Sequence, residues 1–327
     1  MTPADRILGW LREAPTGLSG EEIARRLGCS RAAVFKHVAA LRRQGWEIAA
    51  RHARGYVLGR APDRLGPAEL AAHLTGAWRS IEWLAEVDST QRVARERARG
   101  GAPEGTTVIA EAQTAGRGRL GRTWVSPPGV AFLGSVVLRP PLAPAAVPQV
   151  ALVAGMAVAA AVRETTGLAA TIKWPNDVLV GERKVAGILT EMEAEVDRVH
   201  FVICGIGVNV NTPADAFPPE LTDRATSLAA ALGRPVDRAA FVGRLLAALE
   251  ARYERFVAIG FGAMRSEWEA YSCLTGRRVT VIAPDGEISG TARGVADDGA
   301  LRLERDDGGE ARIVAGEVTL RDGYGRA

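Results

Sequence analysis

Apolar residues recur at the helical spacing of three or four positions near the start of the chain, and this pattern predicts three short amphipathic helices. The apolar positions that define them are Ile7, Leu8, Leu11, Ile23, Leu27, Val34, Val38 and Leu41. Ser19 and Glu22 make a capping box before the second helix, and Ser30 is placed to cap the third helix, which Gly45 ends.

A basic hairpin follows the third helix. Residues 46–50 and 56–58 are typical of two short strands, and the turn between them carries arginine and histidine. This order is that of a winged helix-turn-helix, whose third helix enters the major groove of DNA; a small helical module for protein contact is the alternative. We expect residues 1–62 to bind DNA through these side chains: Ser30, Arg31, Lys36, His37, Arg42, Arg51 and Arg54.

From residue 81 onward, short β-rich runs alternate with helical ones. Buried strands are expected at residues 107–112, 130–138 and 199–210, and a long helix at residues 148–165. A strand stops at Pro175, and residues 184–191 return beside it as the second strand of a hairpin. A linker rich in proline and glycine precedes this part, so a central mixed α/β domain is expected over residues 66–273.

The last part of the chain changes to short strands separated by Asp-Gly turns. The strands are expected at residues 278–283, 288–295, 300–304 and 311–320. This pattern predicts a small β-barrel of the SH3-like kind over residues 274–327. The predicted fold class is therefore α+β and multidomain.

Composition adds a division of charge. The 327 residues include 47% hydrophobic and 24% charged ones, which is ordinary for a globular protein. Residues 1–60 contain eleven Lys or Arg and five Asp or Glu, whereas the whole chain carries a net charge of only +3. The head is thus the basic part, and a basic module suits a polyanionic partner.

Several classes of protein are disfavoured. Three cysteines lie far apart and make no disulfide framework, and the first residues lack a signal-peptide pattern, which favours the cytoplasm. The four histidines show no metal-ligand spacing. No run approaches the roughly 18 apolar residues of a membrane helix. We therefore expect no metal held by a cluster of protein ligands and no membrane partner.

Residues 116–122, the Gly/Arg loop, combine three glycines with three arginines around Leu120. Glycine lets the backbone approach a ligand closely, and arginine offers a charged fork of donors to phosphate or carboxylate, so the loop can close over an anion. It lacks the ending of a Walker A loop, and arginines stand at the spacer positions of the dinucleotide motif. The alternative is a solvated basic turn.

Lysine occurs only three times, and two of the three, Lys173 and Lys184, fall on the strands of the predicted hairpin. The hairpin gathers them at one end of a sheet with Asn176 and Asp177. An anionic nucleotide with its Mg²⁺ suits this mixture, because lysine binds phosphate and a carboxylate can lie near the metal. A surface hairpin with a salt bridge is the alternative.

Two further pairs can contact a ligand. Ser89 and Thr90 follow a strand, and their hydroxyls can bind a polar head group, although capping of the next helix is the better interpretation of this pair alone. Gly205 and Gly207 interrupt a buried strand and leave room for a flat ligand against the backbone.

Six segments form an ordered series: Asp88-Ser-Thr90, Gln113-Thr-Ala-Gly-Arg-Gly-Arg119, Lys173-Trp-Pro-Asn-Asp177, Lys184-Val-Ala-Gly-Ile-Leu189, Gly205-Ile-Gly-Val-Asn-Val-Asn211 and Ala225-Thr-Ser-Leu228. The series resembles the signature motifs of the biotin–protein ligases, in the family's order. With its DNA-binding head, the chain resembles the bifunctional form, a biotin–[acetyl-CoA-carboxylase] ligase that is also the biotin operon repressor. Gln91 stands where the family usually has Asn, and Leu120 where it often has a third basic residue.

The resemblance implies a central domain of the class II synthetase-like kind and an enzyme that uses ATP with Mg²⁺. Biotin would be activated as biotinyl-5′-AMP and transferred to a lysine of a biotin carboxyl carrier protein. It also implies a cytoplasmic homodimer that binds operator DNA and regulates transcription. A lipoate–protein ligase-like enzyme and a ligand-sensing regulator without ligase activity are the alternatives.

The resemblance also implies roles for single residues. The catalytic residues would be Lys184, Arg119 and Arg117. Biotin would be bound by Ser89, Thr90, Gln91, Gln113, Arg117, Gly118, Arg119 and Lys184, with Trp124 shaping an apolar slot. The nucleotide would be bound by Lys173, Asn176, Asp177, Asn209 and Arg321, with Mg²⁺ near Asp177.

Overall fold

The computed structural model describes residues 2–320 except 44, 53, 60–62 and 285. They form two compact units, Met1–Ala72 and His73–Ala327, and each is described by itself. The domain limits expected at residues 62, 66 and 273 stay predictions. Arg321 lies outside the described residues.

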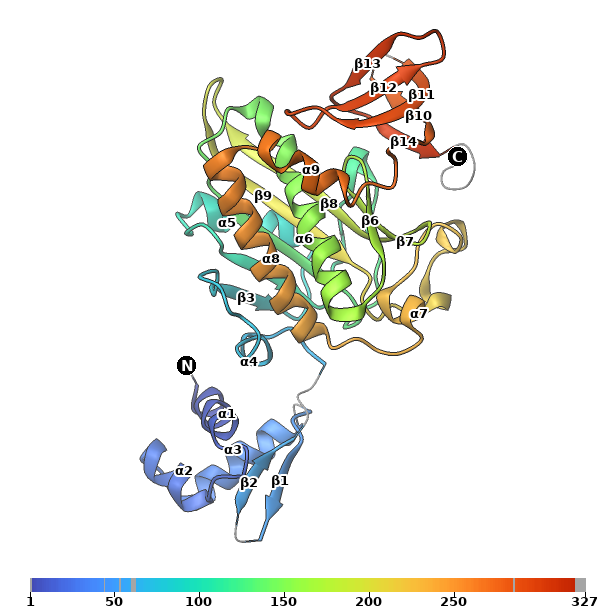
Figure 1. Cartoon of the computed structure of the whole chain (residues 1–327). Helices are drawn as coiled ribbons and strands as arrows, with labels where there is room; N and C mark the ends of the chain where they lie inside the picture. Colours follow the sequence, from blue (N-terminus) through green and yellow to red (C-terminus); the bar gives the residue numbers. More distant parts are fainter. Residues whose placement is uncertain (1, 44, 53, 60–62, 285, 321–327) are drawn as a thin grey trace. The chain divides into compact units, whose positions relative to one another are not determined.

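The N-terminal unit has the predicted order of a winged helix-turn-helix (Figure 1). Its elements are α1 (Pro3–Glu13), α2 (Gly20–Leu27), α3 (Arg31–Arg43), β1 (Ile48–Arg51), β2 (Gly55–Leu58) and α4 (Pro67–Leu70). β1 and β2 pair antiparallel as the predicted hairpin. The helix-spaced apolar residues meet in one core, on which Leu27 packs from a half-buried position.

Two predicted helix starts are confirmed by hydrogen bonds. Ser19 Oγ accepts from the Glu22 N–H at 3.0 Å, and Ser30 Oγ accepts from the Ala33 N–H at 3.2 Å. The Glu22 carboxylate pairs with two arginines of the following turn, so the predicted capping box is only half formed within the described part of α2.

A seven-stranded mixed sheet forms the centre of the second unit (Figure 1). In order of pairing, its strands are β3 (Ile81–Leu84), β4 (Thr107–Ala110), β5 (Phe132–Leu138), β9 (Val199–Val208), β8 (Arg183–Ala194), β7 (Asp177–Val180) and β6 (Ala170–Lys173). β3 and β4 pair parallel, and the other neighbours pair antiparallel.

Helices pack on both faces of this sheet. α6 (Pro148–Thr166) covers one face, and α8 (Arg238–Ile259) packs on α6 (Figure 1). α5 (Thr90–Arg99) packs through Val93 and Ala98 against Val137 and Ile203 of the sheet. The remaining helical elements are α7 (Leu228–Leu232), α9 (Arg265–Glu269), η1 (Arg119–Gly121), η2 (Pro144–Ala146), η3 (Ala214–Ala216), η4 (Pro219–Leu221) and η5 (Gly262–Met264).

α6 corrects one expectation about apolar runs. In the part of the chain that the structure describes, the segment Pro144–Thr166 is the one helix long and apolar enough to cross a membrane by length and composition. However, 78% of its most apolar window is buried inside the unit. A core helix passes the same test, and burial of this extent is that of a core helix.

The hairpin predicted around the two lysines is also corrected. The strand predicted to run up to Pro175 ends at Lys173, and a separate strand, β7, begins at Asp177. Lys184 therefore pairs with Leu179 of β7, which lies between β6 and β8. The pattern missed β7 because this strand is only four residues long and lies between a proline turn and a glycine turn.

The C-terminal part is a five-stranded antiparallel sheet. Its order is β13 (Glu310–Ile313), β12 (Leu301–Arg305), β11 (Gly286–Val295), β10 (Arg278–Ala283) and β14 (Glu317–Leu320). The strand predicted over residues 311–320 is thus split in two. Trp174 Nε1 donates to Gly299 O at 3.0 Å, which joins this sheet to the central domain.

Candidate active site

A row of residues across five strands forms the floor of the candidate site. The register pairs Lys173 with Asp177, Asp177 with Gly187, Gly187 with Gly207, and Gly207 with Leu133. Directly opposed residues of paired strands share one face of a sheet. The floor therefore has two charged residues at one end, an apolar residue at the other and two glycines between them.

This row lies on the face that carries α5. Ile172, which precedes Lys173 in β6, faces Gly155 of α6. Because successive side chains of a strand point to opposite faces, Lys173 points away from α6. The site and the long core helix therefore lie on opposite sides of the sheet.

Above the two glycines lies the inner cavity, with a volume of about 60 Å³. Its lining includes all eight residues predicted to bind biotin: Ser89, Thr90, Gln91, Gln113, Arg117, Gly118, Arg119 and Lys184. A Cβ added to Gly207 would come within 2.7 Å of the Trp124 ring, and one on Gly205 within 2.8 Å of the Gln91 amide. The room predicted over these glycines is therefore partly filled by the protein's own side chains.

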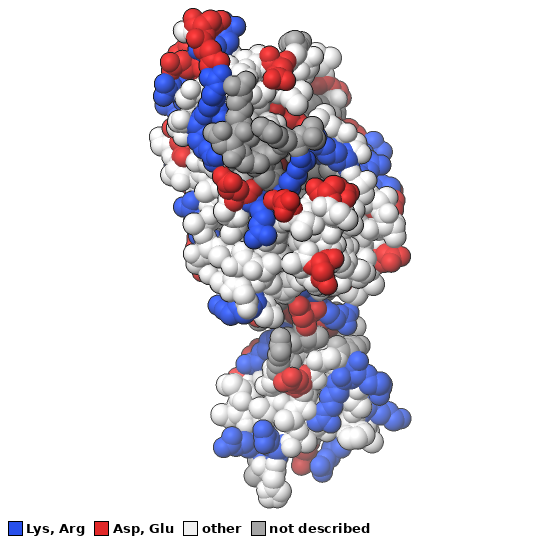
Figure 2. Space-filling model, turned by 90° about the vertical axis from the view of Figure 1, so that its right-hand side faces the viewer, with Lys and Arg blue, Asp and Glu red and all other residues white. Residues whose placement is uncertain are grey.

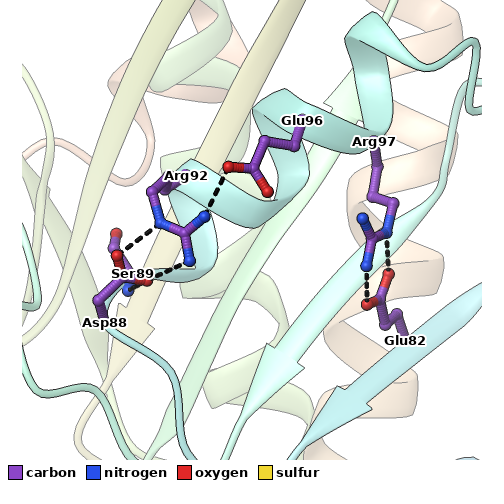
Figure 3. A network of polar contacts seen from close by, with 6 residues as sticks. All are labelled: Glu82, Asp88, Ser89, Arg92, Glu96 and Arg97. Atoms are coloured by element: carbon purple, nitrogen blue, oxygen red, sulfur yellow. Dashed lines mark hydrogen bonds and ion pairs between the residues drawn. The ribbon is translucent and has the colours of Figure 1, made fainter.

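The turn before α5 is fixed by charged groups (Figure 3). Asp88 accepts a hydrogen bond from the Ser89 N–H at 2.7 Å, and Arg92 pairs with the same carboxylate. These two contacts, Arg92 first, lower the pKa of Asp88. Arg97 fixes the other end of α5 through two hydrogen bonds to Glu82 of β3, at 2.7 and 2.6 Å.

Because the turn is fixed in this way, Ser89 is not needed as a cap. It occupies the N-cap position of α5, but its side chain makes no cap bond to the described residues, so the capping interpretation is wrong for this hydroxyl. Gln113 Oε1 instead accepts from the Thr90 N–H at 2.8 Å and from the Thr90 hydroxyl at 3.1 Å. Thr90 Oγ1 also lies 2.9 Å from Ser135 Oγ. The Gln113 amide NH₂ is left to donate to a ligand.

Three buried polar atoms that line the inner cavity have no hydrogen-bond partner among the described residues. They are Ser89 Oγ, Gln91 Oε1 and Trp124 Nε1. A buried polar group left without a partner costs roughly 1–3 kcal/mol. A hydroxyl and an indole N–H donate, and an amide oxygen accepts, so the cavity matches a ligand that presents both an acceptor and a donor.

The Gly/Arg loop folds back on itself beside this cavity. The Gly118 N–H donates to Arg122 O at 2.7 Å, and the Trp124 N–H donates to Gly116 O at 3.0 Å. A Cβ on Gly116 would lie 2.5 Å from Trp124 O, so this close approach requires glycine. At the tip, Leu120 has φ +55° and is 74% exposed.

Two loop arginines bind neighbouring elements. Arg119 Nη1 donates to Asn176 Oδ1 at 2.9 Å, and its Nη2 lies 3.4 Å from Gly316 O. Arg122 pairs with Glu317 of β14. The C-terminal sheet thus helps to hold the loop, a contact that the local sequence pattern did not reveal.

The outer cavity, about 460 Å³ in volume, is lined by the four described residues predicted to bind a nucleotide. These are Lys173, Asn176, Asp177 and Asn209. The inner and outer cavities share five lining residues: Gly118, Arg119, Trp124, Asn176 and Lys184. The two cavities therefore meet where a loop arginine and a strand lysine come together.

Charges are concentrated at this junction. Lys184 Nζ lies 2.6 Å from Asp177 Oδ1 and 5.6 Å from the centre of the Trp124 ring. Burial lowers the pKa of Lys173, an effect that the Asp177 carboxylate opposes. Burial also lowers the pKa of Arg119.

Arg117 lies nearer to solvent. Its side chain is 56% exposed, and its Nη1 is 4.0 Å from Glu191 Oε1. It still lines the inner cavity with Arg119 and Lys184, so the structure brings the three predicted catalytic cations to one space.

Sequence reasoning missed a buried ion pair beneath the loop. Arg238, at the start of α8, is 1% exposed and donates to Glu111 Oε2 at 2.9 Å and to Ala131 O at 3.0 Å. Glu111 and Ala131 lie on the two arms of the segment that carries the Gly/Arg loop. Arginine is too frequent in this chain for its position in the sequence to have indicated this role.

α3 and the hairpin of the N-terminal unit carry the residues predicted to contact DNA. Arg31, Lys36, Arg51 and Arg54 are exposed, and His37 is half-buried. Figure 2 shows Lys and Arg side chains gathered on this unit, with few acidic ones on the face in view. An exposed basic surface of this kind can contact a phosphate backbone.

Two of the predicted DNA contacts have structural partners as well. Ser30 caps α3, and Arg42 Nε donates to Ile48 O at 2.8 Å, which ties α3 to β1. Phe35, beside Lys36 on α3, is 60% exposed and was missed by the sequence analysis.

Comparison with protein families gives three matches along the chain. Residues 83–209 match the biotin/lipoate A/B protein ligase family, residues 4–57 match an HTH domain, and residues 274–321 match the biotin protein ligase C terminal domain.

Whole proteins and a solved structure are similar over most of the chain. The bifunctional ligase/repressor BirA of Bacillus spizizenii is 41% identical over 305 residues, which cover 93% of this chain and 94% of that protein. BirA of Escherichia coli is 33% identical over 93% and 92% of the two chains. The structure of a biotin protein ligase from Aquifex aeolicus in complex with biotin and ATP has a TM-score of 0.64 and 32% identity, and the match covers 74% of this chain and 98% of that one.

Proposed function

Because this chain belongs to the bifunctional ligase/repressor family, with a biotin protein ligase domain behind a helix-turn-helix, we propose how its residues divide the reaction. Its activity is that of a biotin–[acetyl-CoA-carboxylase] ligase. The inner cavity binds biotin and the outer cavity binds ATP. The observation that carries this assignment is the junction of the two cavities at Arg119 and Lys184.

The inner cavity suits the ring system of biotin. A cyclic urea presents one carbonyl acceptor and two N–H donors, and the unpartnered Ser89 Oγ, Gln91 Oε1 and Trp124 Nε1 require both kinds of group. The dithiolane ring of lipoate presents neither a carbonyl nor an N–H. The same cavity therefore favours biotin over lipoate.

In the first half-reaction a carboxylate oxygen of biotin attacks the α-phosphorus of ATP. A P–O bond forms, the bond to pyrophosphate breaks, and biotinyl-5′-AMP results. The barrier includes repulsion between two anions, which Arg117, Arg119 and Lys184 offset. Partial burial strengthens this effect for Arg119 and Lys184, because charges interact more strongly where water is excluded.

Mg²⁺ accompanies ATP in this proposal and is held mainly by phosphate oxygens and water. Within the described residues, no three His, Cys, Asp or Glu side chains could hold a metal together. Asp177 is the nearest predicted carboxylate, and its Oδ1 already pairs with Lys184. This donor set fits a Mg²⁺ that keeps its waters, since Mg²⁺ in nucleotide sites takes one or two protein carboxylates.

In the second half-reaction the amine of a carrier lysine attacks the acyl carbon of the mixed anhydride. An amide bond forms, AMP leaves with the bonding electron pair, and the amine loses a proton. Until the carrier arrives, water competes as nucleophile, so the adenylate must be shielded. We assign this shielding to the Gly/Arg loop, ordered around the adenylate and more mobile before it forms.

The N-terminal unit binds operator DNA through α3 and its hairpin in this proposal, and the protein works as a cytoplasmic homodimer. Ordering of loops by the adenylate favours the dimer, and a dimer contacts two half-sites. Footprinting on operator DNA with and without biotin and ATP tests the coupling. Protection that is equal in both conditions contradicts it.

The activity is tested by incubation with ATP, biotin and a biotin carboxyl carrier domain. We expect the carrier to gain the mass of one biotinyl group. Pyrophosphate exchange should depend on biotin and not on lipoate. Exchange with lipoate alone would support a lipoate ligase, and absence of transfer would support a regulator without ligase activity.

A further inference from the structure

The amide of Gln91 has an orientation that its neighbours determine. Its Nε2 donates to Leu189 O at 3.1 Å and to Glu191 Oε2 at 3.2 Å. A carbonyl and a carboxylate only accept hydrogen bonds, so the flipped amide would place oxygen against oxygen. Oε1 is therefore the atom directed away from β8.

This Oε1 atom is buried and borders the inner cavity. Gln91 is 4% exposed, and Oε1 has no hydrogen-bond partner in the described parts of the chain. The amide already lies against Gly205, where an added Cβ would be 2.8 Å from its carbon. A buried acceptor normally has a donor, and the cavity is where one can reach it.

Glu191 is itself held in place from α5. Arg95 Nη2 lies 2.9 Å from Glu191 Oε2, the oxygen that also accepts from Gln91. The three side chains form a series: Arg95 fixes Glu191, Glu191 fixes the NH₂ of Gln91, and Oε1 is thereby presented to the cavity. Neither Arg95 nor Glu191 belongs to the inner-cavity lining.

We propose that Gln91 Oε1 accepts a hydrogen bond from one ring N–H of bound biotin, and that Arg95 and Glu191 are positioning residues for this contact. The proposal rests on the assignment of the inner cavity to biotin. Gln91 replaces the Asn usual in the family, so the contact belongs to this chain's own side chain and is a determinant of its ligand specificity.

The test measures binding by calorimetry on the full chain, with biotin and with two analogues methylated on one or the other ureido nitrogen. The parent should bind biotin and reject one analogue, the one that replaces the donated N–H. Gln91→Met keeps the length of the side chain but not the acceptor, and should bind biotin roughly tenfold to a hundredfold more weakly. It should also lose most of the discrimination against that analogue.

A matched ion pair provides the control for the positioning residues. Arg99 and Glu193 join the same helix and strand, with Arg99 Nη2 2.7 Å from Glu193 Oε2, and Glu193 has no described contact with Gln91. Glu191→Gln should weaken biotin binding about fivefold, because an amide at residue 191 no longer fixes the Gln91 amide. Glu193→Gln should change it less than about twofold.

The outcomes separate this inference from the proposed function. If Gln91→Met binds biotin as the parent does, or discriminates as strongly, the inference is wrong while the biotin site stands. Equal effects of Glu191→Gln and Glu193→Gln remove the positioning role. Failure of the parent to bind biotin contradicts the proposed function itself. Should Gln91→Met not fold, Gln91→Asn with the same three ligands decides, since its shorter amide should lose part of the affinity and of the discrimination.

Discussion

The floor of the inner cavity and the Gly/Arg loop enclose the same space by different means. The floor is a row of strand residues, from Lys173 to Leu133, fixed by backbone pairing on both sides of most strands. The loop is held by its own turn and by the side chains of Arg119 and Arg122, with Leu120 exposed. We infer that the floor positions the reacting groups and the loop retains their product.

The largest expected effect comes from the floor's lysine. Lys184→Ala removes the cation at the junction of the two cavities and leaves Asp177 there without it. We expect biotin-dependent pyrophosphate exchange to fall about 10²–10³-fold, the usual loss for one group that stabilises developing charge. Operator binding by the N-terminal unit is the control. If exchange and DNA binding fall together, misfolding explains both.

A smaller effect is expected from filling the floor. Gly207→Ala places a methyl group 2.7 Å from the Trp124 ring, so the ring must shift and narrow the inner cavity. Biotin affinity should fall about tenfold, since overpacking costs about 1–3 kcal/mol. Calorimetry with biotin and, separately, with ATP measures this. A loss confined to ATP would mean that the ring does not border the biotin site.

The smallest effect is expected where the loop meets the C-terminal sheet. Arg122 and Glu317 are 67% and 26% exposed at their side chains. An exposed pair contributes about 0–1 kcal/mol, so Glu317→Gln should change adenylate retention by no more than about fivefold. High salt should shrink the difference, and the exchanged pair Arg122→Glu with Glu317→Arg should restore retention. A large effect that salt does not alter would indicate a different role for Glu317.

The comparison also explains what the sequence could predict. The residues of the inner cavity were found because the motif Gln113–Arg119 and the pair Ser89 and Thr90 keep their chemistry within short segments. The row of the floor was not found, because it depends on register between distant strands and on β7, which the pattern concealed. Arg238 was missed for the same reason, since its partners Glu111 and Ala131 lie more than a hundred positions away.

Local signals were also misleading where tertiary contacts took over a task. Ser89 looked like a helix cap, but Asp88 and Arg92 fix that turn and leave its hydroxyl to the cavity. Arg42 looked like a DNA contact, yet its Nε binds Ile48 O.

The division between floor and loop is tested most directly by the lifetime of bound biotinyl-5′-AMP in Arg119→Gly, measured by chasing labelled adenylate from the full chain. The account predicts that this variant still forms adenylate but releases it about tenfold or more faster than the parent, because charge-assisted hydrogen bonds that close the loop are lost. A release rate equal to that of the parent would contradict the assignment of retention to the loop.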